Sequence, residues 1–319
     1  MFSSLARTAR QLLHDLNRSL AREYLAAPEE RALLSAPLKK YQPLSRVTIA
    51  DEVSRTLFEE YAVHREGPRG HEETGWVILG LRESEEAVVL ATLPAGTAAD
   101  AGVAHVQFNS NGQALGSRIV RQTDRRLTIL GVVHTHPGSL RHPSDGDYRG
   151  DSDWIAKLRG GEGIFGIGTA DGGSNGEPLF AHQPKPHVQC LGPLCFSWYS
   201  LRPGDRDYRP LAYRLTLGPD LARPLHPIWC TIEAHAERLD RLCRQQAGVK
   251  FEVAQGAREG SLTIELPLAE RGESMRVLLE GDDVRYYLVQ SGEPVRVDLT
   301  EPHVDRGVYL LLAELAEHR

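Results

Sequence analysis

The sequence predicts a mixed α/β domain followed by a smaller α+β domain, and three observations support this class. Strand-like and helix-like apolar patterns alternate over residues 45–218. Over residues 219–319 a helical pattern is followed by runs in which apolar and polar residues alternate, as in antiparallel strands. The 319 residues, of which 41% are hydrophobic and 25% charged, suit a globular protein of about two domains. Residues 1–44 are expected to form a helical extension.

The N-terminal extension shows apolar residues at helical spacing from Leu5 to Leu25, with arginines on the remaining surface. A second short helix is expected to start at Pro28, and Pro37 and Pro43 mark a linker. Because Glu, Asp and His dilute the basic face, packing on the same protein or on a dimer mate is favoured over membrane binding.

The central domain opens with RVTIADEVSRTLFEEYAVHRE, which predicts a short strand and then a helix capped at Asp51. The following patterns predict strands at 76–81, 87–92, 104–108, 127–134, 164–169, 195–201 and 213–217, with helices at about 114–125 and through Trp154 and Leu158. In the last hundred residues we expect a helix through Leu239, an antiparallel meander beginning at SLTIELPL, and a closing helix near 308–316.

The stretch HTHPGSLRHPSDGD, which begins at His134, has the residue types of a metal site. Strand side chains alternate, so His134 and His136 point to one face while Thr135 points away. The carboxylate of Asp147 could supply a third ligand, and a His, His, Asp set leaves the fourth tetrahedral position of a zinc ion open, as in catalytic sites. Each part also has a structural interpretation, because H-x-H is often a surface or core pair and Ser144 with Asp147 fits a helix capping box.

The complete pattern, with seven residues between His136 and Ser144 and then Asp147, resembles the JAMM (MPN+) family of zinc metalloproteases. That family also has an upstream glutamate before a strand ending in a run such as L-L-G, and HEETGWVILG resembles this segment. The resemblance covers about residues 45–215, and it implies a cytidine-deaminase-like mixed sheet with flanking helices. One departure is Trp76, where many relatives have a small residue, so the groove beside it is expected to differ.

The resemblance implies a role for each residue. His134, His136 and Asp147 would bind Zn²⁺, which lowers the pKa of a bound water molecule towards about 7. Glu73, rather than its neighbour Glu72, would accept and return the proton, and Ser144 would stabilise the oxyanion.

The implied activity is that of an isopeptidase that cleaves after the C-terminal glycine of a ubiquitin-like protein, in deconjugation or in precursor processing. The sequence resembles bacterial members, so a ubiquitin-like conjugation or anti-phage defence pathway is expected, with E1-like and E2-like enzymes as further partners. The alternatives are a non-catalytic MPN scaffold and another zinc amide hydrolase. An amidohydrolase would require a (β/α)₈ barrel and a metallo-β-lactamase an H-x-H-x-D-H run, and neither pattern is present.

Composition narrows the partners and the location. The formal net charge is −6 and the charges are interspersed, which argues against nucleic acid as a partner. No apolar run of about 18 residues occurs, so we expect no membrane partner and a cytoplasmic protein. The four cysteines are too few for a secreted disulfide framework.

Two weaker metal candidates remain. His142 is expected to face solvent or to support the ligands rather than to bind metal. A second zinc site among His182, His187, Cys190 and Cys195 is disfavoured, because the spacing is irregular and Cys195 falls in a predicted buried strand.

Overall fold

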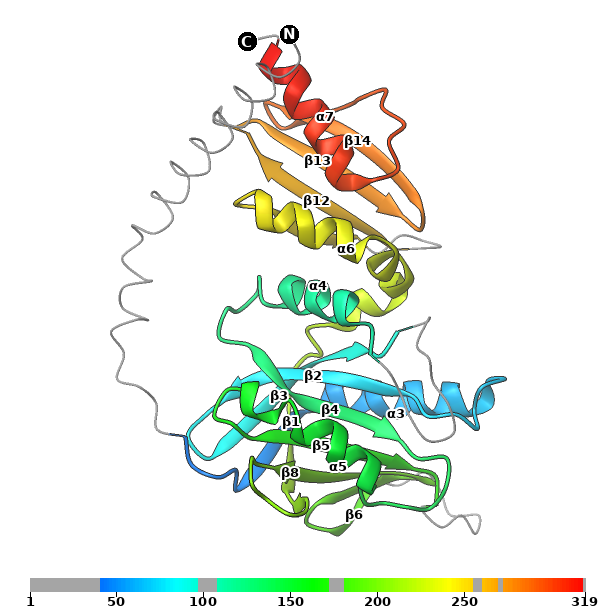
Figure 1. The fold of residues 1–319 in the computed structure, drawn as a ribbon. Coiled ribbons are helices and arrows are strands. Elements are labelled where there is room, and N and C mark those ends of the chain that lie inside the picture. Colours follow the sequence, from blue (N-terminus) through cyan, green and yellow to red (C-terminus); the bar gives the residue numbers. More distant parts are fainter. Residues whose placement is uncertain (1–40, 97–107, 172–180, 255–259, 269–271, 318–319) are drawn as a thin grey trace. The chain divides into compact units, whose positions relative to one another are not determined.

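The computed structural model describes residues 41–96, 108–171, 181–254, 260–268 and 272–317. These residues fall into two compact units, the first ending at Trp229 and the second beginning at Cys230 (Figure 1). The helices expected before residue 41 lie outside the described residues, as does nearly all of the strand expected at 104–108. The domain boundary near residue 218 stays a prediction.

A mixed sheet forms the body of the first unit. In the described part of the chain its strands run in the order β10-β1-β3-β2-β4-β5-β8-β7-β6, and β9 pairs with β8. The strands are β1 (Arg46–Ala50), β2 (Gly75–Arg82), β3 (Glu86–Pro94), β4 (Thr128–Thr135), β5 (Gly163–Thr169), β6 (Ala181–Lys185), β7 (Val188–Leu191), β8 (Leu194–Leu201), β9 (Arg209–Pro210) and β10 (Ala212–Thr216). Because β4 pairs antiparallel with β2 and parallel with β5, the predicted mixed sheet is confirmed.

Helix α3 (Asp51–Glu66) covers one face of this sheet (Figure 1). Its buried residues Val53 and Leu57 belong to the same apolar cluster as Trp76 and Phe196 from the strands. The helix forms because these apolar residues recur at helical spacing, and burying them against the sheet supplies most of its stability.

The predicted cap of α3 is wrong by one residue. Ala50 occupies the N-cap position and makes no side-chain capping bond. Asp51 instead accepts a hydrogen bond from the backbone N–H of Gly218 at 2.9 Å, which ties the start of the helix to the segment after β10. The carboxylate still lies in the first turn, where the helix dipole favours negative charge.

A β-bulge in β4 sets which side chains face α3. The pairing of β2 with β4 shifts between Ile78 and Leu79, so that Ile78 lies opposite Gly131 but Leu79 lies opposite Ile129. Leu130 and Val133 therefore both enter the α3 cluster although they are three residues apart.

Helix α4 (Ser110–Val120) packs on β3, where Gly116 lies close to Leu93. Helix α5 (Asp145–Ser152) and the 3₁₀ turns η1 (Ile155–Lys157) and η2 (Arg223–Ile228) complete the first unit. The helix expected through Leu158 ends at Ser152 instead, and a 3₁₀ turn follows it.

The second unit is α+β, as predicted. In its antiparallel sheet each strand pairs with the next strand along the chain. Its elements are α6 (Trp229–Gln245), β11 (Lys250–Ala254), β12 (Ser261–Pro267), β13 (Ser274–Glu280), β14 (Asp283–Gln290), β15 (Glu293–Arg296) and α7 (Val304–Glu317). Alternate strand residues such as Leu262, Val277 and Tyr286 are fully buried. None of the helices in the described part of either unit is both long enough and apolar enough to span a membrane.

Candidate metal centre

The two histidines lie at the end of β4, in the middle of the sheet. His134 is opposite Gly75 of β2 and beside Ile167 of β5, and the backbone N–H of His136 donates to Gly168 O at 2.8 Å. Both side chains are buried, with 6% of their surface exposed. Pairing on both sides of β4 therefore fixes the backbone that carries them, and both imidazoles are present on one face as the alternation predicted.

Three side chains converge at this point. His134 Nε2 lies 3.2 Å from His136 Nε2 and 3.2 Å from Asp147 Oδ1, while His136 Nε2 lies 3.5 Å from Asp147 Oδ2. Zinc binds such donors at about 2.0–2.2 Å, and tetrahedral angles then require donor atoms about 3.3 Å apart. One donor atom from each of the three residues lies within 4.8 Å of the other two, and in the described residues this is the only such group of three or more His, Cys, Asp or Glu side chains.

The hydrogen bonds of His136 select its tautomer. Its Nδ1 lies 2.7 Å from the carbonyl oxygen of Leu140, which can only accept, so Nδ1 carries the proton. The Nε2 lone pair is then directed at His134 and Asp147, where a metal ion would bind. Burial lowers the pKa of His136, but hydrogen bonding to Asp147 and to the Leu140 carbonyl outweighs it, so the pKa is raised overall. The ring is therefore basic and oriented, which suits a ligand.

Helix α5 positions the third candidate ligand. Ser144 is its N-cap, with Ser144 Oγ accepting from the backbone N–H of Asp147 at 3.2 Å and Asp147 Oδ2 accepting from the backbone N–H of Ser144 at 2.6 Å. The capping box considered from the sequence is thus present, and it is compatible with a metal site because Asp147 Oδ1 stays directed at His134. Burial raises the pKa of Asp147, but its hydrogen bonds with the two histidines lower it far more, so the carboxylate is ionised.

Glu73 and Glu72 lie in different environments. Glu73 is buried, with 6% exposure, and its charge contributes to the raised pKa of His136. Glu72 forms an ion pair with Arg69 at 2.6 Å on the surface. Thr74, the residue after Glu73, is hydrogen-bonded to the end of β4. Thr135 N–H donates to Thr74 O at 2.9 Å, and Thr74 N–H donates to Thr135 Oγ1 at 3.0 Å.

Asp151, one helical turn after Asp147, was not identified from the sequence. Tyr208 Oη donates to its carboxylate at 2.7 Å, and burial raises the pKa of Asp151 to about 6. The i, i+4 spacing from Asp147 was the available signal, since it places both carboxylates on one face of α5. His134 and Asp147 both act electrostatically on Asp151, so this carboxylate is close to the candidate site.

The other sequence candidates lie outside the cluster. His142 is nearly half exposed, packs edge-on against Tyr199 and is not part of the candidate ligand group. Cys190 and Cys195 are joined by a disulfide across the β7–β8 hairpin, a bond that the sequence analysis did not predict. Because both sulfurs are used, these two cysteines are not zinc ligands in this structure.

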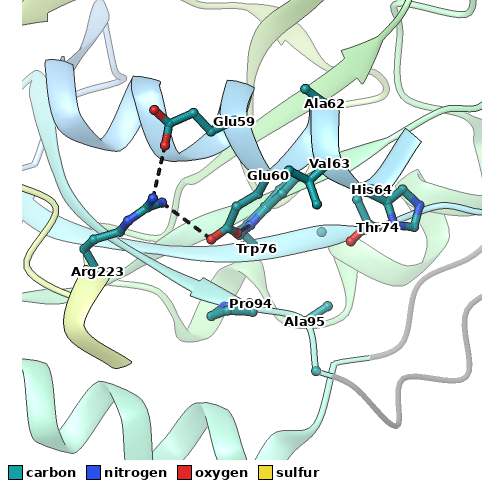
Figure 2. A pocket seen from close by; sticks show the side chains of 12 residues that line it. Glu59, Glu60, Ala62, Val63, His64, Thr74, Trp76, Pro94, Ala95 and Arg223 are labelled. Carbon is teal, nitrogen blue, oxygen red and sulfur yellow. Dashed lines mark hydrogen bonds and ion pairs between the residues drawn. The ribbon is translucent and has the colours of Figure 1, made fainter. Parts of the chain in front are cut away.

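A groove of about 650 Å³ begins next to Glu73, at Thr74 and Gly75, and extends across the first residues of β2 (Figure 2). Val63 supplies an exposed apolar side chain to the groove, whereas Trp76 is almost fully buried, and Glu59, Glu60 and Arg223 give one side charged groups. The lining residues are Glu59, Glu60, Ala62, Val63, His64, Thr74, Gly75, Trp76, Pro94, Ala95, Gly96 and Arg223.

The charged side of the groove is internally paired. Arg223 lies 3.0 Å from Glu59 and 3.7 Å from Glu60, and Glu60 also accepts from the indole N–H of Trp76 at 2.7 Å (Figure 2). His226, behind the groove, bonds Glu60 through Nδ1 and the carbonyl of Thr92 through Nε2. Trp76, noted as the departure from the family pattern, is therefore held in place as part of the groove.

Comparison with known proteins bears on the same region. Residues 54–175 match the family model described as prokaryotic homologs of the JAB domain. This match spans Glu73, Ser144 and all three candidate ligands, and the mixed sheet with flanking helices is consistent with a JAB/MPN fold.

Beyond the family model, no curated protein matches the chain. Among solved structures, the chain is similar to the solution structure of a protein from Desulfitobacterium hafniense, at 15% identity and a TM-score of 0.35, over 54% of this chain and 94% of that chain. A likeness at this level carries no conclusion about function.

Proposed function

We propose that the first unit is a zinc-dependent isopeptidase or peptidase that cleaves after the C-terminal glycine of a ubiquitin-like protein. The observation that carries the proposal is the convergence of His134, His136 and Asp147 at zinc-like spacing, beside a buried glutamate. The JAB family match over the same residues supports it. The donor set of two imidazoles and one carboxylate also fits a zinc site that keeps a position for water.

Zinc bound there would supply a Lewis acid and lower the pKa of a water molecule. In the proposed reaction Glu73 accepts the proton of that water and delivers it to the leaving amine, for which its burial beside the histidines is suitable. As the N-cap of α5, Ser144 uses only its hydroxyl oxygen, which accepts the backbone N–H of Asp147. Its hydroxyl proton therefore stays free to donate to an oxyanion.

The groove beside Glu73 suggests where the substrate chain lies. It starts at Thr74 and continues past Trp76, so a peptide segment bound in it would reach the candidate base. Main-chain groups at this point are already used, since Ala95 N–H donates to Gly75 O at 2.8 Å. We therefore propose that apolar contact with the exposed side chain of Val63, which lines the groove, contributes to substrate binding here, in addition to pairing with a strand edge. A narrow approach to the metal would favour glycine at the cleaved bond.

The substrate class and pathway are the less direct part of the proposal. They come from the resemblance of the HTHP and ETGWVILG segments to JAMM isopeptidases, together with the family match. We propose that the partners are a ubiquitin-like protein or its conjugates, with E1-like and E2-like enzymes of a bacterial conjugation or defence pathway, in the cytoplasm.

The test combines metal analysis with a cleavage assay on a ubiquitin-like protein joined through its terminal glycine to a lysine, or extended at its C-terminus. We expect one zinc per chain and cleavage after the glycine. Zinc binding without cleavage of any ubiquitin-like substrate would refute the isopeptidase. Absence of zinc binding would leave the scaffold as the better function.

A replacement of the glycine before the cleaved bond by valine tests the narrow approach to the metal. We expect kcat/KM to fall by at least about tenfold, because a Cβ would crowd the chain at that position. An unchanged kcat/KM would remove this part of the proposal, and efficient hydrolysis of unrelated unfolded peptides would remove recognition of the folded protein.

A further inference from the structure

The loop that joins His136 to Ser144 holds the two ends of the candidate site, yet its middle has little apolar packing. The Leu140 side chain is 54% exposed, and a Cβ added at Gly138 would meet no atom within 4 Å. Despite this exposure, the Leu140 carbonyl makes the hydrogen bond that fixes the tautomer of His136. Something other than a hydrophobic contact of Leu140 must therefore set the position of this carbonyl.

The next residue, Arg141, is held by an ion pair with the carboxylate of Asp171 after β5 and by a hydrogen bond to the Asp171 carbonyl. Arg141 Nε donates to the two carboxylate oxygens of Asp171 at 2.9 and 3.1 Å, and Arg141 Nη2 donates to Asp171 O at 3.2 Å. The carboxylate is itself oriented, because Thr169 Oγ1 donates to Asp171 Oδ1 at 2.7 Å. Thr169 is fully buried in β5, so the pair is anchored in the strand next to the one that carries the histidines.

A third contact holds the loop backbone. Tyr199 Oη on β8 donates to the carbonyl oxygen of Arg141 at 2.7 Å, and the Tyr199 ring is buried, with 4% exposure. The peptide unit after Leu140 is thus fixed through the Arg141 side chain and through the Arg141 carbonyl. We call Arg141, Asp171 and Tyr199 the loop clamp.

We propose that the loop clamp positions the Leu140 carbonyl so that His136 presents Nε2 to a metal ion. Arg141, Asp171 and Tyr199 are then positioning residues, since they act through Leu140 and do not reach the donor atoms. The inference rests on the proposed zinc site, but it concerns which nitrogen of His136 carries the proton. Partners that fix the tautomer of a ligand histidine typically change metal affinity by about 10–100-fold when they are removed.

The chain offers a matched control. Arg126 and Asp124 form an exposed ion pair in which Nε likewise contacts both carboxylate oxygens, at 3.1 and 3.0 Å, and Nη2 lies 2.7 Å from one of them. This pair lies before β4 in the same unit and is not connected to Leu140 by any described bond. Replacing it removes an equivalent surface ion pair without touching the loop.

The first experiment measures zinc affinity of the full chain by competition with a chromophoric chelator, for Asp171→Ala, Arg141→Gln, Tyr199→Phe and the control Asp124→Ala. We expect the dissociation constant to rise about 10–100-fold for Asp171→Ala and Arg141→Gln, less for Tyr199→Phe, and not at all for the control. Arg141→Lys should recover only part of the zinc affinity, because a single ammonium group cannot contact the carboxylate and the carbonyl oxygen of Asp171 as the guanidinium does. Substitution with Co²⁺ should show an altered visible spectrum in the clamp variants.

The second experiment needs no metal. Long-range ¹H–¹⁵N NMR of the metal-free chain should show His136 protonated at Nδ1, and Tyr199→Phe, which preserves the buried ring, should shift the population towards the other tautomer. Unchanged zinc affinity and an unchanged His136 tautomer in folded clamp variants would overturn the inference. Failure of the wild-type chain to bind zinc would instead count against the proposed function, and the tautomer measurement would still decide the role of the clamp.

Discussion

The described residues of the first unit contain two largely buried clusters that pair histidine with a carboxylate, one around His226 and one around His136, and their hydrogen bonds are balanced differently. At the first, His226 places Nδ1 against the carboxylate of Glu60 and Nε2 against the carbonyl of Thr92. Both partners accept, so both ring nitrogens donate and the imidazole is cationic. Burial lowers the pKa of His226, but these partners outweigh it and the pKa is raised. Trp76 and Arg223 complete the shell of Glu60, so this cluster carries its own positive charge.

The second cluster has the same kinds of partner around one histidine, a carbonyl and a carboxylate, but a second imidazole, that of His134, directs its Nε2 at the same point, so donors and acceptors are not balanced. His136 uses Nδ1 for the Leu140 carbonyl, and its Nε2 is directed at His134 Nε2 and the ionised Asp147. Two imidazole nitrogens and a carboxylate therefore approach one another, with 3.2–3.5 Å between the nearest atoms. A proton or a metal ion would relieve the repulsion between these electron pairs. The comparison teaches that residue types alone do not separate a candidate metal site from a structural cluster, whereas the number of electron-pair donors directed at one point does.

The largest expected effect comes from removing a ligand at the unbalanced cluster. We expect His134→Ala or Asp147→Ala to abolish stoichiometric zinc binding and cleavage, because two donors cannot hold the ion in an open site. Elemental analysis of the purified chain is the measurement. Full zinc occupancy in a double substitution of His134 and His136 would show that the cluster is not the metal site.

Next in size is the effect of Glu73→Gln, which keeps the shape of the side chain but removes the base. We expect zinc content to remain and kcat to fall by about 10²–10⁴-fold. Glu72→Gln is the matched control, since Glu72 pairs with Arg69 at the surface, and its effect on kcat should be small. A reversal of these two effects would assign the base to Glu72.

The balanced cluster should matter for stability and not for metal. We expect His226→Gln to destabilise the first unit by roughly 2–4 kcal/mol, because it leaves Glu60 with less compensation for its charge. Zinc content should stay at one per chain. Urea unfolding measures the change in the free energy of unfolding, and elemental analysis of the same samples measures zinc. Loss of zinc in the folded variant would contradict the separation of the two clusters.

The smallest expected effect is a pH dependence of stability from the same histidine. The folded-state pKa of His226 is raised above its ordinary value, so the stabilisation is fully present below about pH 6.5 and is lost as pH rises through the folded pKa. The free energy of unfolding should therefore fall with rising pH in this range. His226→Gln should show a flatter profile, and an equal slope in both proteins would count against the cationic form.

Much of the fold could be predicted because its patterns are local. The apolar run that ends at His134, and the alternation that places His136 beside it, are properties of one strand, and the spacing to Ser144 and Asp147 is a property of one loop and helix. The second unit was predictable for the same reason, since its meander connects neighbouring strands.

The rest depends on partners that are distant in sequence. The clamp joins Arg141 to Asp171, 30 residues away, and a hydrogen bond joins Glu60 of the groove to His226, 166 residues away. Strand β6 was missed because all five residues are exposed and one is Pro184, so it has neither an apolar pattern nor strong strand propensity. The cap of α3 was misassigned because Asp51 bonds Gly218, which no local rule identifies.

The bulge in β4 determines how many residues that strand can lose without changing which face its side chains lie on. Leu130 and Val133 share the α3 core only because one extra residue changes the alternation between them. Removing one residue between them would leave a regular pleat in which both still face the core and His134 still faces the site, whereas removing two would put Leu130 and Val133 on opposite faces. The bulge is thus a place where β4 can lose one residue and still present its histidines to the site, and a single deletion there should be far better tolerated than a double deletion.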